Sequence, residues 1–187
     1  MNFWKELKKP IVGLAPMDGI TDPAMRFITK KYGNPDVIYT EFVSAEGLAR
    51  KAKALFNDLR FDESERPIVA QLFGIDPESF REAAKIVVDL GFDGVDINTG
   101  CPAKNVMSRG GGARLIKNYP LAREIVLAVK EEVDGKIPVS VKTRIGYGEV
   151  DFDWIKRLSE LDLAAIAVHG RTSRQGYGGS ADWEVLR

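Results

Sequence analysis

The chain has 187 residues, of which 44% are hydrophobic and 29% are charged, a composition typical of a globular protein and not of a disordered or collagen-like chain. Its 27 basic and 27 acidic residues balance, so any site for a polyanion must be local. The sequence contains no run of about 18 apolar residues, the length that a membrane-spanning helix needs. The first residues lack the apolar core of a signal peptide, so the cytoplasm is the expected location.

Short apolar, β-branched runs alternate with amphipathic stretches along the chain. The runs predict six strands, at residues 11–14, 37–40, 68–73, 94–98, 139–143 and 165–168. Helices are predicted between them, at residues 21–33, 76–91, 119–133 and 151–161. Asp22-Pro23 and Asp76-Pro77 are typical helix starts, because an Asp side chain caps the first turn and Pro fits its first position. Strands that alternate with helices predict parallel βαβ units.

Two architectures fit this order, an open doubly wound sheet and a closed (β/α)8 barrel. The open sheet would place a G-x-G-x-x-G phosphate loop after the first strand, but residues 14–19 read LAPMDG. In a barrel, chemistry gathers in loops after every strand, and polar, glycine-rich segments follow strands four, five and six here. We therefore predict an α/β fold, a TIM (β/α)8 barrel truncated to about six strands, because a full barrel needs about 250 residues.

The segments that follow strands four, five and six are basic and contain no acid. Residues 98–117, 142–148 and 169–181 hold ten of the 18 glycines and no Asp or Glu. Their cations are Lys104, Arg109, Arg114, Lys117, Lys142, Arg144, Arg171 and Arg174. Such a rim suits phosphate groups, although acids elsewhere in the fold could also balance these loops.

Cys101 and His169 are the only cysteine and histidine in the chain, so we expect no disulfide and no metal centre. Cys101 follows the strand GVDIN between Gly100 and Pro102. A lone cysteine is often a small buried apolar residue, but a thiol in such a loop could also donate a proton or act as a nucleophile. His169 follows AAIAV and could bind a ligand at a strand end or take part in a core hydrogen-bond network.

Two further polar residues interrupt apolar strands. Alternation along the fifth strand places Ser140, Lys142 and Arg144 on one face. Two cations on one face of a barrel strand favour an anionic ligand, because burying an unpaired charge is costly. Gln71 lies in the third strand, where a buried amide must find hydrogen-bond partners.

Taken together, these motifs resemble one family. LAPMDGITD (14–22), QLFG (71–74), DINTGCP (96–102), VKTRIG (141–146) and HGRTSRQGYGGSADW (169–183) are similar to motifs of the FMN-dependent tRNA-dihydrouridine synthases. The resemblance extends in order across nearly the whole chain. It implies a TIM barrel that binds FMN and converts selected tRNA uridines to 5,6-dihydrouridine. NADPH or NADH would reduce the FMN.

The resemblance also implies roles for individual residues. Cys101 would be the general acid that protonates C5 of uracil. Asn98, Arg144 and Arg171 would contact the uracil or the flanking RNA. The flavin contacts would be Ala15, Pro16, Met17, Asp18, Gln71, Lys142 and His169.

The family has two further strands and a helical tRNA-binding domain, which residues 1–187 do not include. We therefore expect this catalytic barrel portion to hold FMN weakly and to be poorly active. Two alternatives remain: another FMN barrel oxidoreductase that acts on a free pyrimidine, and a non-catalytic RNA-binding fragment.

Overall fold

The computed structural model describes residues 2–187, which form one parallel sheet covered by helices. The sheet order is β1-β2-β3-β4-β5-β6, and every neighbouring pair is parallel. The strands are β1 (Gly13–Leu14), β2 (Val37–Ser44), β3 (Ile68–Phe73), β4 (Gly94–Asn98), β5 (Val139–Arg144) and β6 (Ala165–His169). The longer helices are α1 (Pro23–Gly33), α4 (Pro77–Asp89), α6 (Tyr119–Val133) and α7 (Phe152–Ser159).

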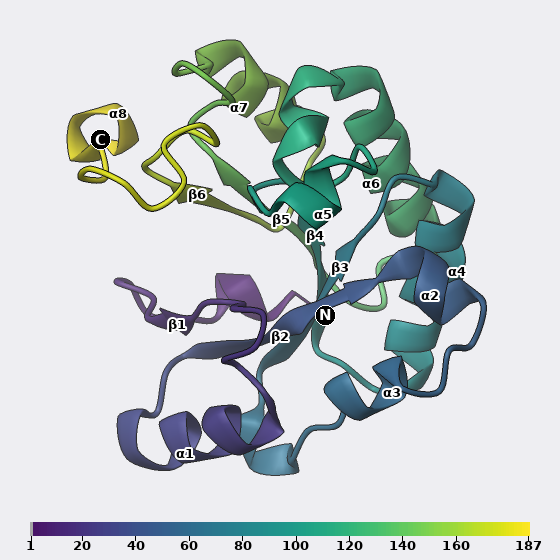
Figure 1. Ribbon diagram of the computed structural model, residues 1–187. Coiled ribbons are helices and arrows are strands. Elements are labelled where there is room, and N and C mark those ends of the chain that lie inside the picture. Colours follow the sequence, from purple (N-terminus) through teal and green to yellow (C-terminus); the bar gives the residue numbers. More distant parts are fainter. Residues whose placement is uncertain (1) are drawn as a thin grey trace.

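The sheet curves into part of a barrel and stays open between β1 and β6. Figure 1 shows α1, α4, α6 and α7 around the outside of the sheet, with the opening on the side where β1 and β6 lie. The two strands are the ends of the sheet order, and β6 is half-buried along its length whereas β4 is fully buried. The predicted fold, an α/β barrel truncated to six strands, is confirmed. None of the helices in residues 2–187 has the length and apolar character needed to cross a membrane.

The long helices begin where the cap residues predict. The carboxylates of Asp22 and Asp76 accept hydrogen bonds from the backbone N–H groups of Met25 and Ser79, at 2.7 and 2.9 Å, and proline follows each Asp. Helix α4 turns its apolar side to the core, burying Phe80, Ala83, Ala84 and Val87. This helix therefore packs an apolar side of helical spacing against the sheet, whereas Leu90, which shares that spacing, is exposed.

Three features of the fold differ from the prediction. Strand β1 is only two residues long, and Ile11 packs instead on an apolar cluster with Val37, Tyr39 and Val69. Strand β2 is longer than predicted, and its register with β3 shifts between Tyr39 and Phe42. Such an irregularity redirects the side chains beyond it. The short helices that the periodicity did not reveal are α2 (Ala45–Ala49), α3 (Leu55–Asp58) and α5 (Lys104–Met107). Another short helix, α8 (Trp183–Leu186), begins where the alternation of strands and helices predicts a helix after the sixth strand.

A buried ion pair supports the loop that follows β1. The Arg26 Nε donates to Glu65 Oε2 at 2.8 Å, and both side chains are buried. Arg26 Nη1 also donates to the carbonyl of Thr21, whose hydroxyl accepts from the backbone N–H of Met17 at 2.9 Å. The ion pair thus holds the segment from Met17 to Thr21 against the barrel. Loss of one partner would leave the other as an uncompensated buried charge.

Candidate active site

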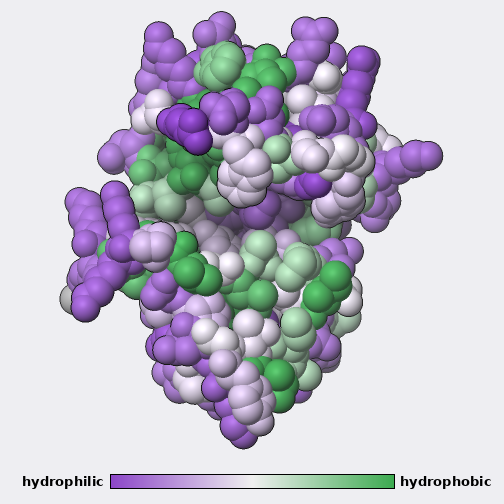
Figure 2. Space-filling model, turned by 90° about the vertical axis from the view of Figure 1, so that its left-hand side faces the viewer, coloured by the Kyte–Doolittle hydropathy of each residue, from purple (hydrophilic) through white to green (hydrophobic). Residues whose placement is uncertain are grey.

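A cavity of about 440 Å³ lies at the carboxyl ends of the strands. The space-filling view in Figure 2, from the open side of the barrel, shows this face hollowed between an upper and a lower half. The cavity brings together most of the residues predicted from the sequence: Pro16, Met17, Asp18, Gln71, Asn98, Cys101, Lys142, Arg144 and His169. Loop and strand-end residues far apart in the chain therefore share one cavity, as expected for a barrel of parallel strands.

A chain of buried hydrogen bonds links the barrel interior to the Cys101 loop. The carboxylate of Asp96 accepts from Gln71 Nε2 at 2.7 Å and from Ser140 Oγ at 2.6 Å. Gln71 Oε1 accepts from Asn98 Nδ2 at 3.0 Å, and Asn98 Oδ1 accepts from the Cys101 backbone N–H at 2.9 Å. Because an ionised carboxylate only accepts hydrogen bonds, Asp96 fixes the orientation of both amides. The position of the Cys101 backbone thus depends on Asp96.

Asp96 and Lys142 are two ionisable groups inside the barrel, and each affects the pKa of the other. Burial raises the pKa of Asp96 to about 6, while hydrogen bonds from Ser140 and Gln71 and the nearby Lys142 charge act in the opposite direction. Burial lowers the pKa of Lys142, and the Asp96 charge opposes that effect. Lys142 makes no side-chain hydrogen bond and no ion pair with any described residue. Its ammonium group is therefore available to a ligand in the cavity.

Cys101 is a half-buried thiol on a tightly packed loop. Burial raises the pKa of the Cys101 thiol, and the Asp18 charge adds to this, so the group is protonated at neutral pH. The Cys101 carbonyl accepts from the Ala113 N–H at 2.9 Å, which ties the loop to the segment after α5. Gly112 has a φ of 56°, and a Cβ there would lie 2.7 Å from the Cys101 carbonyl oxygen. Only glycine fits this approach without displacing the loop.

Arg144 joins two of the loops that border the cavity. Its guanidinium donates to the carbonyls of Gly100 at 2.7 Å, Thr172 at 3.1 Å and Gly176 at 2.8 Å. The ring of Tyr177 lies 5.6 Å away, within the range of a cation–π contact. Most of the Arg144 donors are thus used within the protein, so this side chain positions the Cys101 loop in addition to lining the cavity.

His169 faces the cavity from the end of β6. Burial and the nearby charges of Arg144, Lys142 and Arg171 lower the pKa of His169 to about 4, so the imidazole is neutral at pH 7. Arg171 Nη1 lies 3.2 Å from His169 Nε2, and its other nitrogens donate to the carbonyl of Gly179 at 2.8 and 3.2 Å. Arg171 therefore lies behind His169 rather than along the cavity wall.

Two predicted site residues lie outside this cavity. Arg171 holds His169 as described, and Ala15 lines a neighbouring cavity of about 490 Å³ between β1 and β6. Conversely, the structure adds residues to which the sequence assigned no role in the site: Ile20, Phe42, Asp96, Ser140 and Tyr177. Asp96 carried a signal, an acid within the buried strand GVDIN. Phe42 carried no such signal. It lies beyond the register shift of β2, which alters the direction of the side chains that follow, and the sequence does not reveal that shift.

The fold and the cavity define a parallel α/β-barrel protein with an enzyme-like site at the carboxyl ends of its strands. The family model described as dihydrouridine synthase matches residues 13–187. The chain therefore belongs to the dihydrouridine synthase family.

Curated relatives agree with the family model. The chain is 40% identical to a probable tRNA-dihydrouridine synthase of Staphylococcus aureus and to probable tRNA-dihydrouridine synthase 2 of Bacillus subtilis, each over 99% of this chain and 57% of the relative. The chain thus spans little more than half the length of the curated relatives that it matches.

Among solved structures, the fold is similar to a morphinone reductase, with 16% identity and a TM-score of 0.57 over 91% of this chain and 69% of that chain. It is also similar to a variant of NCR from Zymomonas mobilis, with 19% identity and a TM-score of 0.54 over 91% of this chain and 67% of that chain. At these identities the similarity concerns the fold.

Proposed function

We propose that this chain is the catalytic barrel portion of a tRNA-dihydrouridine synthase, which reduces the C5=C6 bond of specific tRNA uridines. Strands seven and eight and a helical tRNA-binding domain would lie outside residues 1–187. A tRNA substrate would place the protein in the cytoplasm. The observation that carries the proposal is the shared cavity of Cys101, Gln71, Lys142 and His169. Family membership supports the same activity.

The cavity suits FMN as the cofactor. Its volume of about 440 Å³ lies within the range of small-molecule sites, and Met17 and Phe42 provide apolar walls for a planar ring. The ammonium group of Lys142, which no described residue neutralises by contact, matches the electron-rich edge of such a ring. Residues that would hold the group are Ala15, Pro16, Met17, Asp18, Gln71, Lys142 and His169. NADPH, or NADH, would be the reductant.

The reaction needs a hydride at C6 and a proton at C5 of the uracil. A reduced flavin supplies the hydride when bound. Cys101 supplies the proton: its S–H bond breaks as the C5–H bond forms, leaving a thiolate that solvent reprotonates. Burial keeps the thiol protonated at pH 7 and so favours this role.

The remaining residues position the substrate and the acid. Asn98 and Arg144, together with Arg171 behind His169, are the proposed contacts to the uracil or the flanking RNA. Asn98 and Arg144 also fix the Cys101 loop, through the backbone N–H of Cys101 and the carbonyl of Gly100. The uridine must leave its stack to reach the cavity, which costs a few kcal/mol and less for an unpaired loop base.

Replacement of the thiol tests this proposal. Cys101→Ala should bind FMN and allow its reduction by NADPH, and should lower dihydrouridine formation by roughly 100-fold or more, because proton transfer by a positioned acid contributes about that factor. Flavin bleaching at 450 nm measures the first step, and dihydrouridine in an unmodified tRNA transcript measures the second. Ser159→Ala, at an exposed hydroxyl on α7 away from the cavity, is the control. Undiminished product from Cys101→Ala, or faster reduction of free uracil than of tRNA, would contradict the proposal.

A further inference from the structure

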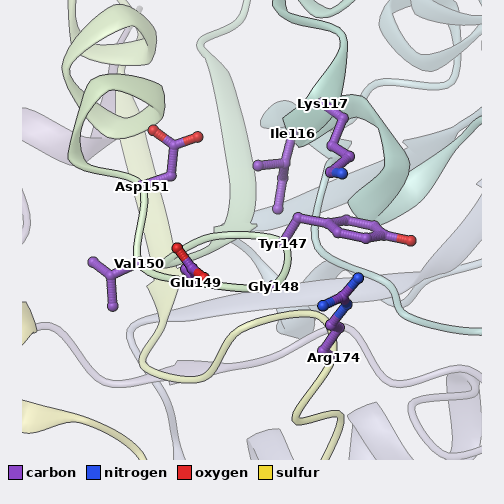
Figure 3. A pocket seen from close by; sticks show the side chains of 8 residues that line it. All are labelled: Ile116, Lys117, Tyr147, Gly148, Glu149, Val150, Asp151 and Arg174. Atoms are coloured by element: carbon purple, nitrogen blue, oxygen red, sulfur yellow. The ribbon is translucent and has the colours of Figure 1, made fainter.

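A second hollow, of about 620 Å³, lies on the outer side of the loops that form the active site. The ring of Tyr147 lines it and is contacted by two cations. Lys117 Nζ lies 4.9 Å from the ring centroid, and the Arg114 guanidinium lies 5.9 Å from it. Figure 3 shows Lys117 and Arg174 directed toward Tyr147 from opposite sides. We call Arg114, Lys117, Tyr147 and Arg174 the Tyr147 cluster.

The cations of the cluster have no ion-pair partner in the described part of the chain. None of the ion pairs among residues 2–187 includes Arg114, Lys117 or Arg174. Glu149 and Asp151 line the opposite part of the hollow (Figure 3), and the Asp151 carboxylate caps α7 by accepting from the Trp154 N–H at 2.9 Å. Three exposed cations in close proximity repel one another, so an anion placed between them would be stabilised.

The cations continue in one direction beyond the cluster. Arg114 also lines an adjoining hollow of about 700 Å³, whose other residues include Lys104 and Arg109 and no acid. Since Glu149 and Asp151 occupy the other side, an extended anion would run from Arg174 past Tyr147 to Lys104. A chain of phosphates along a single strand has this form, and an aromatic ring between cations is typical of single-stranded nucleic-acid sites.

The cluster shares its loops with the active site. Arg114 follows Ala113, whose N–H donates to the Cys101 carbonyl, and the Arg174 N–H donates to the Tyr147 carbonyl at 2.8 Å. Arg174 precedes the cavity residue Tyr177 by three residues, so their backbones are within about 11 Å. A strand bound at the cluster would therefore pass close to the mouth of the catalytic cavity.

We propose that the Tyr147 cluster binds the phosphodiester backbone of the RNA strand next to the target uridine. This inference rests on the proposed function, because it assumes an RNA substrate. Arg174 and Lys117 contact phosphates, and Tyr147 provides a face for one flanking base. Gly148 leaves room for this arrangement, because a Cβ there would lie 3.3 Å from Arg174 Cδ.

RNA binding by single-charge variants tests the inference. The dissociation constant of an unmodified tRNA transcript is measured by filter binding at several salt concentrations, for the 187-residue chain and for Lys117→Gln and Arg174→Gln. Each variant should bind roughly fivefold to tenfold more weakly, and the slope of log K against log salt should fall by about 1 in magnitude. Lys31→Gln is the matched control, because Lys31 lies 5.5 Å from the ring of Tyr32 on α1, without a second cation on that ring.

The outcomes separate the inference from the proposed function. Binding within twofold of wild type in both variants, or the same loss in Lys31→Gln, would overturn the inference. Tyr147→Leu should weaken binding without changing the salt slope, and an unchanged affinity would remove the base-stacking role. The measurement involves no turnover, so it stands even if Cys101→Ala shows that the proposed reaction is wrong. Unchanged urea midpoints of the variants verify that they fold.

Discussion

Asp96 is a fully buried carboxyl group whose two oxygens hold Gln71 and Ser140. Its folded-state pKa of about 6 lies above the ordinary value of 3.8. As the pH rises from 4 to 6, the unfolded chain ionises at this residue before the folded one does. The native state therefore loses stability over this range, on the order of 3 kcal/mol in total at 1.36 kcal/mol per pKa unit.

Asp96→Asn should remove this loss. The free energy of unfolding of the variant, relative to wild type, should increase between pH 4 and pH 6 and become constant above pH 6. Urea unfolding of both proteins at pH 4, 5, 6 and 7 measures the difference between their free energies of unfolding. The titration of the groups that both proteins share cancels in this difference. Parallel stability curves for the two proteins would show that Asp96 does not titrate in this range.

Single residues of the site were largely predictable, but their partners were not. Gln71, Cys101, Lys142 and His169 stand out because polar groups within or directly after apolar strands meet at one end of a parallel barrel. The sequence cannot show that the Gln71 amide is engaged by Asp96 and Asn98. It also cannot show that Arg144 binds loop carbonyls, because these partners are brought together only by the tertiary fold.

At the scale of elements, the segment after β4 depends on Gly112. This segment, with α5 and the 3-10 helix Gly112–Lys117, holds the Cys101 loop through the bond from Ala113 to the Cys101 carbonyl. Gly112→Ala would cost about 1–2 kcal/mol for its positive φ alone. The new Cβ would also displace the Cys101 carbonyl, which it would otherwise approach to 2.7 Å.

Gly135→Ala is the matched control, because Gly135 has a φ of 70° and nothing within 4 Å of a Cβ. Both variants should lose stability from backbone strain, and Gly112→Ala should lose more, because its Cβ also approaches the Cys101 carbonyl. Only Gly112→Ala should slow dihydrouridine formation. Urea unfolding and initial rates on tRNA measure the two effects. Equal rates for both variants would mean that the Cys101 loop tolerates displacement.

The elements themselves were predicted to different degrees. Strands β3 and β4 and the caps of α1 and α4 match the structure, because an apolar run and a capping Asp act locally. The short helices α2, α3 and α5 were missed, because four or five residues do not complete two turns of a periodic pattern. The length of the two-residue β1 was overestimated. Ile11 belongs to the apolar cluster with Tyr39 and does not pair with β2 as part of the strand.

For the molecule as a whole, the decisive feature is the opening between β1 and β6 (Figure 1). The neighbouring cavity there, of about 490 Å³, includes Gly13, Ala15 and Pro16 from one side and residues 164–167 from the other. Lys142 and Pro16 border both this cavity and the catalytic one, so the two are adjacent. Unpaired strand edges also present free backbone donors and acceptors, which favour association between chains.

We therefore expect the 187-residue chain to bind FMN weakly. A ligand between Met17 and His169 touches the loop after β1 and the end of β6, and no strand connects these two edges of the sheet. Part of the binding energy must therefore be spent on ordering the two edges. Purified chain should carry far less than one flavin per protein after gel filtration, and added FMN should dissociate with a constant above about 10 μM, measured by quenching of flavin fluorescence. Stoichiometric yellow flavin on the purified chain would show that the half-barrel is already a complete cofactor site. A longer chain that pairs β1 and β6 with added strands should bind FMN at least tenfold more tightly, because pre-ordering the edges removes that cost.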